Sequence, residues 1–163
     1  MEAFSRVVEL AAAAAVLFLY PVISIGQNEA LILTLTFRVY TAELADGIRT
    51  HGYLTLEEYE EYRSRCEGFG ILGEIRIETS GQRYEETAGV WYEEVTTQEE
   101  IMDELSRNGY VRFRQGDSLM IAVRADLEGI AGVLYKMTGE EGIWIRTGGV
   151  IRDETEPVYS FIS

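Results

Sequence analysis

The hydrophobic and polar positions of this chain divide it into a strongly apolar beginning and a mixed remainder. Residues 10–25 read LAAAAAVLFLYPVISI, a run of 16 residues without a charge. With its flanks, the run 7–26 gives a 20-residue helix, and at about 1.5 Å per residue such a helix crosses the ~30 Å hydrocarbon core of a bilayer. Pro21 lies inside the run, where a membrane helix tolerates it as a kink. The pattern therefore predicts a membrane-spanning N-terminal helix.

Two other interpretations of the same run are open at this level. A cleaved secretory signal would use MEAFSR as its first region and the small residues Ser24 and Gly26 ahead of the cleavage point. A core helix of a soluble protein would pack its five consecutive alanines tightly against neighbours. We favour the membrane span. Arg6, with no matching positive charge just after the run, then places the N-terminus in the cytoplasm.

The segment that follows, residues 31–40, carries two periodicities. Its apolar and polar residues alternate, which is typical of a strand. The same segment also begins a stripe at helical spacing, made of Leu33, Phe37, Tyr40, Leu44 and Ile48. Because no turn signal separates it from the apolar run, we expect one long helix over residues 1–50. A second, extracytoplasmic domain is expected over residues 51–163.

Helix-start signals recur in the second domain. Thr55 with Glu58 and Thr97 with Glu100 have the spacing of a capping box, in which each residue's side chain bonds the other's backbone amide. The second of these helices is expected to stop at an Asn-Gly pair, which favours a left-handed turn. The helices predicted in this domain run from 55 to about 68, from 97 to 108 and from 127 to 137.

Alternating residues predict antiparallel strands between these helices. Ile75 and Ile77 alternate with charged neighbours, as in a half-exposed strand. A turn at 115–117 suggests that the strands on either side of it form a hairpin. The predicted strands are 71–79, 90–95, 110–114, 119–124 and 142–151, the last with a break at Gly148-Gly149. The expected fold class is α+β: a long N-terminal transmembrane helix followed by a small head of antiparallel strands and short helices.

Composition limits the possible partners of the head. The formal net charge is −14, from 28 acidic and 14 basic residues. Such a surface repels phosphates, so nucleic acid is not expected as a partner. Cys66 is the single cysteine, which rules out an internal disulfide. At its position near the end of the first predicted head helix, we expect it to be a buried small apolar residue.

The residue inventory offers little for catalysis. The one histidine, His51, is expected in a solvated turn, and a lone histidine makes neither a metal site nor a triad. Phosphate-loop, zinc-protease and nucleophile-elbow motifs do not occur. Glu140-Glu141 with Asp117 or Asp126 would suit Ca²⁺, but their spacing is not that of a calcium loop. We therefore expect no enzyme activity, no cofactor and no metal.

Glu9 is a carboxylate just inside the edge of the apolar run. Insertion of such a charge costs about 2.5–3.5 kcal/mol at the bilayer centre and less near the interface. Its side chain could reach the headgroups, or it could pair with a positive group such as the N-terminal amine of a neighbouring subunit in a helix bundle. Both interpretations are kept.

Several segments resemble one family of bacterial surface proteins. The start MEAFSRVVELAAAAAVLFLYPVISIGQNEALILTLT, the segment DGIRTHGYLTLEEYEEY, and more loosely GILGEIRIET, TTQEEIMDEL and GDSLMIAVRADLEGIAG are similar to TadE-type minor pilins. These are type IV pilin-like subunits of tight-adherence (Flp-type) pili, or related secretion systems, in Gram-positive bacteria.

The resemblance implies a structural, non-catalytic subunit or accessory protein at the cell surface. Glu9 would correspond to the acidic residue near the start of pilin helices, and Pro21 to their kink. Cleavage by a prepilin peptidase would fall between Ala3 and Phe4, although the spacing to Glu9 is one residue longer than usual. The partners implied are other pilin-like subunits and membrane lipid. The alternative function is a membrane-tethered binding module whose head recognises a protein, a peptide or a glycan.

Overall fold

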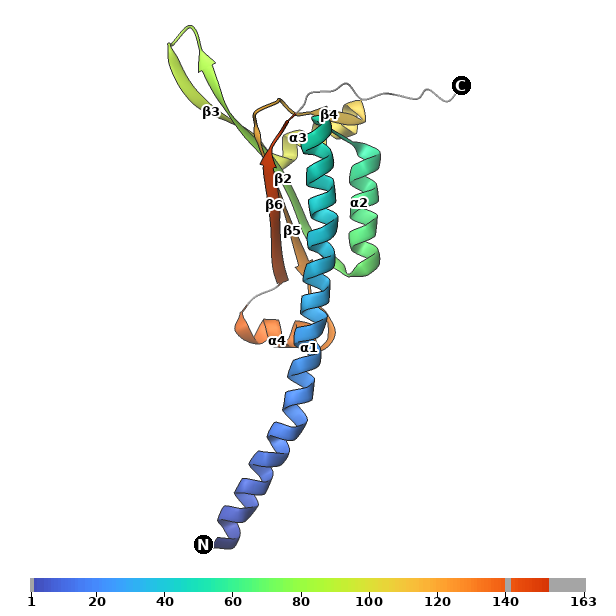
Figure 1. The fold of residues 1–163 in the computed structure, drawn as a ribbon, viewed down its shortest axis with the longest axis vertical. Coiled ribbons are helices and arrows are strands. Elements are labelled where there is room, and N and C mark those ends of the chain that lie inside the picture. Colours follow the sequence, from blue (N-terminus) through green and yellow to red (C-terminus); the bar gives the residue numbers. More distant parts are fainter. Residues whose placement is uncertain (1, 140–141, 153–163) are drawn as a thin grey trace, which may run out of the picture.

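One helix, α1 (Glu2–His51), runs from one end of the molecule to the far side of the head (Figure 1). The computed structural model describes residues 2–139 and 142–152 of the chain. At about 1.5 Å per residue the 50 residues of α1 extend about 75 Å. The buried residues of its second half recur at helical spacing: Ala30, Phe37, Thr41, Ala45 and Ile48. The long helix is thus confirmed. The strand interpretation of residues 31–40 is wrong, because the buried residues of this helix pack against the head.

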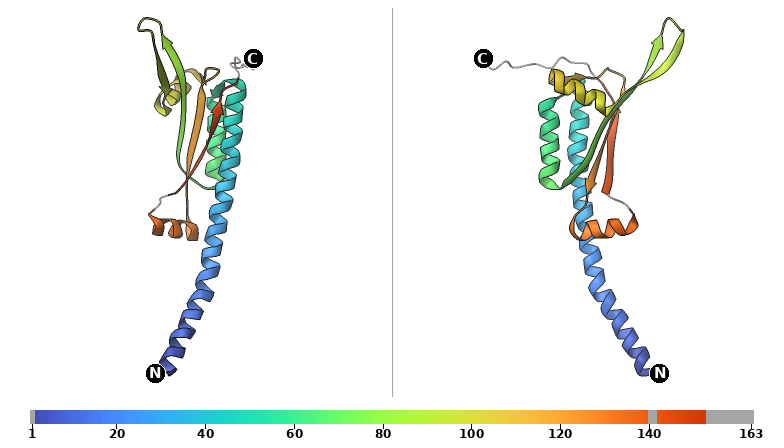
Figure 2. Two further views of the ribbon diagram at one scale, coloured as in Figure 1. Left: turned by 60° about the vertical axis from the view of Figure 1, so that its left-hand side comes forward. Right: turned by 180° about the vertical axis from the view of Figure 1, so that it is seen from behind.

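A four-stranded antiparallel sheet forms the centre of the head. Its strand order is β3-β2-β5-β6, and the strands are β2 (Ile71–Glu85), β3 (Val90–Thr96), β5 (Ser118–Asp126) and β6 (Gly142–Val150). In β2, β5 and β6, alternate residues, among them Ile77, Ile121 and Ile145, are buried on one face, whereas β3 has no buried residue. The second half of α1 covers this face and α2 (Leu56–Phe69) lies beside it (Figure 2).

Both capping boxes form as the sequence predicts. The Thr55 backbone amide donates to the Glu58 carboxylate at 2.9 Å, and the Glu58 amide donates to Thr55 Oγ1 at 3.2 Å, at the start of α2. At the start of α3 (Gln98–Asn108), the Thr97 amide donates to Glu100 at 2.8 Å. This helix ends at Gly109, whose φ of 75° is left-handed.

The remaining elements lie at the two ends of the sheet. A short ribbon pairs β1 (Tyr53–Thr55) with β4 (Tyr110–Arg112). At the other end, α4 (Gly129–Thr138) connects β5 to β6 and crosses α1 (Figure 1). The α+β layout of one long apolar helix, a small antiparallel sheet and short helices is therefore as predicted.

The hairpin expected around residues 115–117 does not form. Residues 110–112 pair with β1 instead, because the Leu56 amide donates to the Gly109 carbonyl at 2.9 Å and brings the two segments together. Strand β5 pairs with β2 and β6. The break expected at Gly148-Gly149 is also absent. Both glycines pair with β5, and a side chain at Gly148 would collide with the Leu119 carbonyl.

The hydrophobic core of the head includes residues on both sides of position 50, after which the second domain is expected to begin. Phe37 of α1 is fully buried with Tyr62 of α2 and Val123 of β5. The Thr41 and Tyr62 hydroxyls, both buried, are hydrogen-bonded at 2.9 Å. The second half of α1 is therefore part of the head, and only its first half projects.

Candidate membrane-anchoring site

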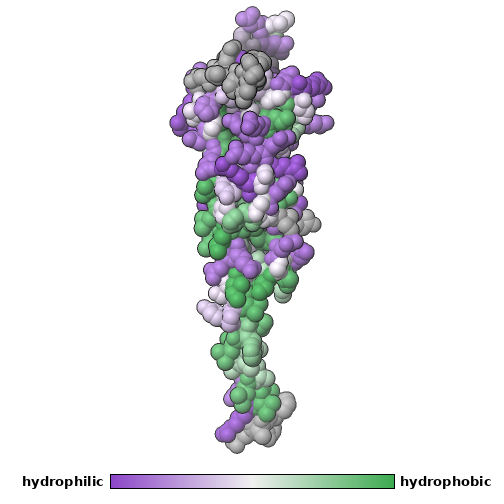
Figure 3. Space-filling model, turned by 90° about the vertical axis from the view of Figure 1, so that its right-hand side faces the viewer, coloured by the Kyte–Doolittle hydropathy of each residue, from purple (hydrophilic) through white to green (hydrophobic). Residues whose placement is uncertain are grey.

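The projecting first half of α1, residues 5–25, is here called the stalk. Its side chains are exposed, apart from a half-buried Ser24. The helix is long and apolar enough to cross a membrane, and none of its most apolar stretch is buried. On the face drawn in Figure 3, apolar residues cover the stalk and reach the lower part of the head, and hydrophilic residues cover most of its upper part. The core-helix interpretation therefore does not describe this monomer.

The stalk is apolar around its whole circumference. Eleven large apolar side chains are exposed along it: Val7, Val8, Leu10, Val16, Leu17, Phe18, Leu19, Tyr20, Val22, Ile23 and Ile25. A helix that is apolar on every side is stable only when protein or lipid surrounds it. Leucine, isoleucine, phenylalanine and valine each favour insertion by about 0.3–0.6 kcal/mol at the centre of a membrane helix. The stalk thus has the chemistry of a bilayer-spanning segment.

The charged residues of the stalk, Arg6 and Glu9, lie at its N-terminal end. Ser5 Oγ donates to Glu9 Oε1 at 3.3 Å, one turn away on the same helix, and both side chains are exposed. This bond satisfies only part of the carboxylate's capacity to accept hydrogen bonds. Glu9 therefore presents a charge that a headgroup or a neighbouring subunit can pair with.

The other predicted residues of this segment lie within the helix. The Ala3–Phe4 peptide belongs to the first turn of α1, and the side chains of these two residues lie outside the described part of the structure. Pro21 lies inside the helix without ending it. Because proline lacks an amide hydrogen, the Leu17 carbonyl loses its usual donor. The axis of α1 curves along this half of the helix (Figure 2).

Where the stalk joins the head, α1 and α4 cross at close range, and no sequence motif predicts this contact. Gly26 is buried, and a Cβ atom there would lie 2.7 Å from Leu134 Cδ1 and 3.0 Å from Ile130 Cγ2 of α4. Ala30 of α1 and Ala131 of α4 continue the contact and are both buried. Small residues on both helices thus let α4 approach the end of the apolar run.

At the opposite end of the head, the end of β2 and most of β3 form a projecting hairpin arm (residues 81–95). Beyond Ser80, β2 pairs with β3 but no longer with β5, and the arm extends above the sheet (Figure 1). Tyr84 and Trp91 are 51% and 68% exposed, with their rings 5.2 Å apart. The arm therefore carries an exposed aromatic pair far from the stalk.

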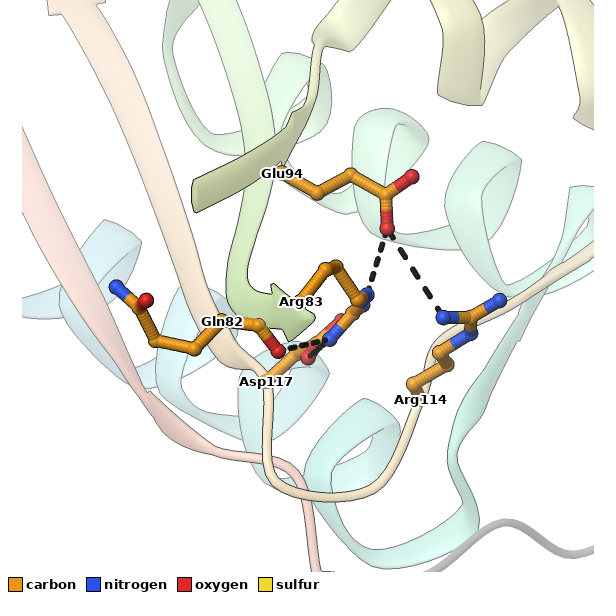
Figure 4. Close-up of polar contacts among 5 residues, drawn as sticks. All are labelled: Gln82, Arg83, Glu94, Arg114 and Asp117. Atoms are coloured by element: carbon orange, nitrogen blue, oxygen red, sulfur yellow. Dashed lines mark hydrogen bonds and ion pairs between the residues drawn. The ribbon is translucent and has the colours of Figure 1, made fainter. Parts of the chain in front are cut away.

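An ion-pair network fixes the base of this arm (Figure 4). Arg83 donates to both carboxylate oxygens of Asp117, at 2.8 and 2.6 Å, and through Nε to Glu94 at 2.7 Å. These carboxylates raise the pKa of Arg83 above its ordinary value, chiefly through the Asp117 bonds. A side chain at position 81 would collide with the Asp117 carboxylate and displace it, so Gly81 leaves room for this ion pair. The network joins the arm to the loop before β5.

The two aspartates considered as alternative calcium ligands lie far apart. Asp117 and Asp126 stand at opposite ends of β5, about 30 Å apart at ~3.3 Å per residue. Each has an arginine partner, because Asp126 accepts from Arg124 at 2.9 Å. Glu140 and Glu141 lie outside the described residues. Among the residues that are described, no three potential ligands come together.

The single cysteine and the single histidine each lie against aromatic side chains. Cys66 is fully buried against Phe37 and Tyr62, as predicted, and burial raises the pKa of its thiol to about 11. Burial likewise raises the pKa of Tyr62. His51 is exposed at the last residue of α1, not in a turn, and its ring stacks on Tyr53 at 5.7 Å.

Comparisons with protein-family models, with curated proteins and with solved structures found no match for this chain. The geometry of the stalk, the α4 crossing and the hairpin arm therefore carries the functional argument. Glu9 and Pro21 belong to the stalk as the sequence suggests. The α4 crossing and the arm were missed, and an isolated Gly26 at the end of the apolar run was the only signal for the first.

Proposed function

We propose that this chain is a single-pass membrane protein of pilin-like type, which holds its acidic head outside the cell and associates with other subunits through the stalk. The observation that carries this proposal is the uncharged surface of residues 10–25, which is exposed apart from a half-buried Ser24. The continuous helix from the stalk into the head core supports it, because forces on one are transmitted to the other without a flexible link.

Glu9 supplies the polar contact of the proposed assembly. In lipid, hydrogen bonds and charge pairs between helices replace the hydrophobic effect as a source of specific association. A carboxylate near the end of the stalk can pair with the N-terminal amine of a neighbouring copy, while Ser5 bonds only one of its oxygens. Processing between Ala3 and Phe4 would bring that amine closer to Glu9.

The first experiment separates insertion from assembly. Full-length protein carrying Glu9→Leu should remain in the membrane after alkaline extraction but lose its oligomers on native gels in mild detergent. Glu29→Gln is the matched control, because Glu29 is an exposed carboxylate on the same helix beyond the stalk. Wild-type protein released by alkaline extraction would reject the membrane assignment. Unchanged oligomers in Glu9→Leu would reject the role of Glu9.

The intact mass of the membrane-extracted protein tests processing. An unprocessed chain, a chain without its first three residues and a chain cut after Gly26 differ by amounts that mass spectrometry resolves. Loss of everything up to Gly26 would identify the run as a secretory signal and remove the stalk from the mature protein. Loss of three residues would support the pilin-like assignment.

The hairpin arm favours one alternative, a membrane-tethered binding module. Exposed aromatic side chains are common anchors of binding surfaces, and Tyr84 with Trp91 forms such a pair at the end of the molecule opposite the stalk. Peptide and glycan arrays probed with the full chain test it. Binding that is lost in a Tyr84→Ser, Trp91→Ser double variant and kept in Glu9→Leu would favour the binding module over the assembly subunit.

A further inference from the structure

The helix α4 is the part of the described head that lies nearest the stalk. It lies across α1 at the base of the sheet (Figure 1), and the two views of Figure 2 place it there as well. Its contact is made at Gly26, the last residue of the 20-residue span. A groove between the two helices is lined by stalk and α4 side chains together, including Ile23, Leu134 and Tyr135. The α4 surface therefore continues the surface of the stalk.

One side of α4 is apolar and faces away from the core. Ala131 is buried against α1, with 2% of its surface exposed. At about 100° per residue, Val133 and Met137 lie on the opposite side of the helix. These two side chains are 60% and 80% exposed. Val133 and Met137 are four residues apart, so they form one exposed apolar strip along α4, next to the end of the stalk.

We propose that α4 lies in the interfacial layer of the bilayer that the stalk crosses, with Val133 and Met137 among the upper acyl chains. This inference rests on the proposed membrane anchoring. If residues 7–26 fill the ~30 Å hydrocarbon core, Gly26 lies at its outer edge. Because α4 touches Gly26, it lies at the same depth. The geometry of the crossing, not a separate affinity, brings α4 to the membrane.

The side chains around the apolar pair agree with a headgroup environment. Lys136, the only lysine of the chain, is exposed next to Met137, and Tyr135 is half-buried at the groove. Lysine and tyrosine place their apolar bodies in acyl chains and their polar ends among headgroups. Glu29 and Glu128 are exposed close to α4, so an anionic surface would repel this region. The lipid is therefore expected to be zwitterionic.

Contact with the membrane through both the stalk and α4 would orient the head. A single helix leaves the tilt and rotation of a head undetermined, since tilt depends on neighbours and on interfacial residues. A second contact through α4, which lies across α1 in Figure 1, would restrict both. The head would then stand upright on the membrane with the hairpin arm pointing away from it.

Site-specific fluorescence on the full chain in phosphatidylcholine vesicles tests this arrangement. Single cysteines replace Met137, Leu17 in the stalk, or Glu104 on α3 at the far end of the head, and each carries an environment-sensitive fluorophore. The unsubstituted chain is the labelling control, because Cys66 is fully buried. The positions are exposed, so the substitutions leave the fold intact, which circular dichroism checks. Quenchers are spin-labelled lipid and aqueous iodide.

We expect the Met137→Cys and Leu17→Cys labels to lose most of their fluorescence to the lipid quencher and the Glu104→Cys label to lose it to iodide. Lipid quenching at 17 with iodide quenching at 137 would overturn the α4 inference and leave the anchor intact. Iodide quenching at both would overturn the anchor as well. A label at 137 shielded from both quenchers, with cross-links between copies, would identify a second chain as the occupant and overturn the lipid contact.

Discussion

Gly26 and Gly47 offer a matched pair for measuring the contact between α1 and α4. Both lie in α1, but only Gly26 lies under another element. A Cβ atom at Gly26 would lie 2.7 Å from Leu134 Cδ1, 3.0 Å from Ile130 Cγ2 and 3.3 Å from the backbone nitrogen of Ala131. Among the described residues, nothing lies within 4 Å of a Cβ at Gly47.

These distances determine whether each of three substitutions raises or lowers the free energy of unfolding. Alanine is more favourable than glycine inside a helix by about 0.8–1.0 kcal/mol, so Gly47→Ala should raise the free energy of unfolding by nearly this amount. Gly26→Ala gains the same propensity but must displace two side-chain ends, so we expect a net change near zero. Gly26→Leu places further atoms against the α4 backbone, which cannot rotate away, and such overpacking costs about 1–3 kcal/mol.

Thermal unfolding of the full chain in mild detergent measures these changes. Tryptophan fluorescence is a suitable signal, because Trp91 and Trp144 both belong to the head sheet. One kcal/mol corresponds to about 2–4 °C in Tm for a chain of 150–250 residues. Gly47→Ala should therefore unfold a few degrees above wild type and Gly26→Leu below it. A Gly26→Leu protein as stable as Gly47→Ala would refute the close packing of α4 on α1.

Three further predictions concern the head. Asp117→Ala should lower the free energy of unfolding by about 1.5–3 kcal/mol, because it removes both charge-assisted bonds to Arg83, whose side chain is only 18% exposed. The control Asp103→Ala breaks an exposed ion pair and should cost under about 1 kcal/mol. Urea unfolding compares the two variants, and equal costs would contradict the Arg83–Asp117 network. Phe37→Ala should cost about 3–5 kcal/mol through its cavity, while Leu35→Ala, at a 50% exposed position of the same helix, should change little; similar losses would place the core elsewhere. Cys66 should resist thiol reagents at pH 8, because its pKa of about 11 leaves ~0.1% of it as thiolate. Since an unfolded thiol titrates near ~8.5, the contribution of the buried thiol to stability should be full below pH ~8.5 and should fall as the pH rises from there to about 11. Rapid labelling of the folded protein would refute the burial.

Signals between neighbours in sequence were enough for the helices. The side chains of Thr55 and Glu58, three residues apart, bond the backbone at the start of α2 without help from the rest of the chain. The stripe of α1 is equally local, since Phe37 and Ile48 fall on one face by helical periodicity. Exposure of the stalk did not follow from its composition, because a buried core helix would be equally apolar; the tertiary structure shows it.

Pairings between distant residues needed the tertiary structure. The sequence around Gly116 predicts a hairpin, yet β4 pairs with β1 because α2 and α3 bring their ends together. The arginine at position 83 and the aspartate at position 117 carry no motif, and only the register of β2 on β5 makes them meet.

The sequence alone therefore determined a long apolar helix, the capped head helices and an acidic α+β head, because each depends on interactions within a few residues. Only the tertiary structure decided which strands pair, and that α4 lies on Gly26 at the end of the apolar run. The α4 contact joins residues more than 100 positions apart, and β1 pairs with β4 across more than 50. Their energy comes from shape and burial in the assembled fold, which no local pattern of side chains specifies.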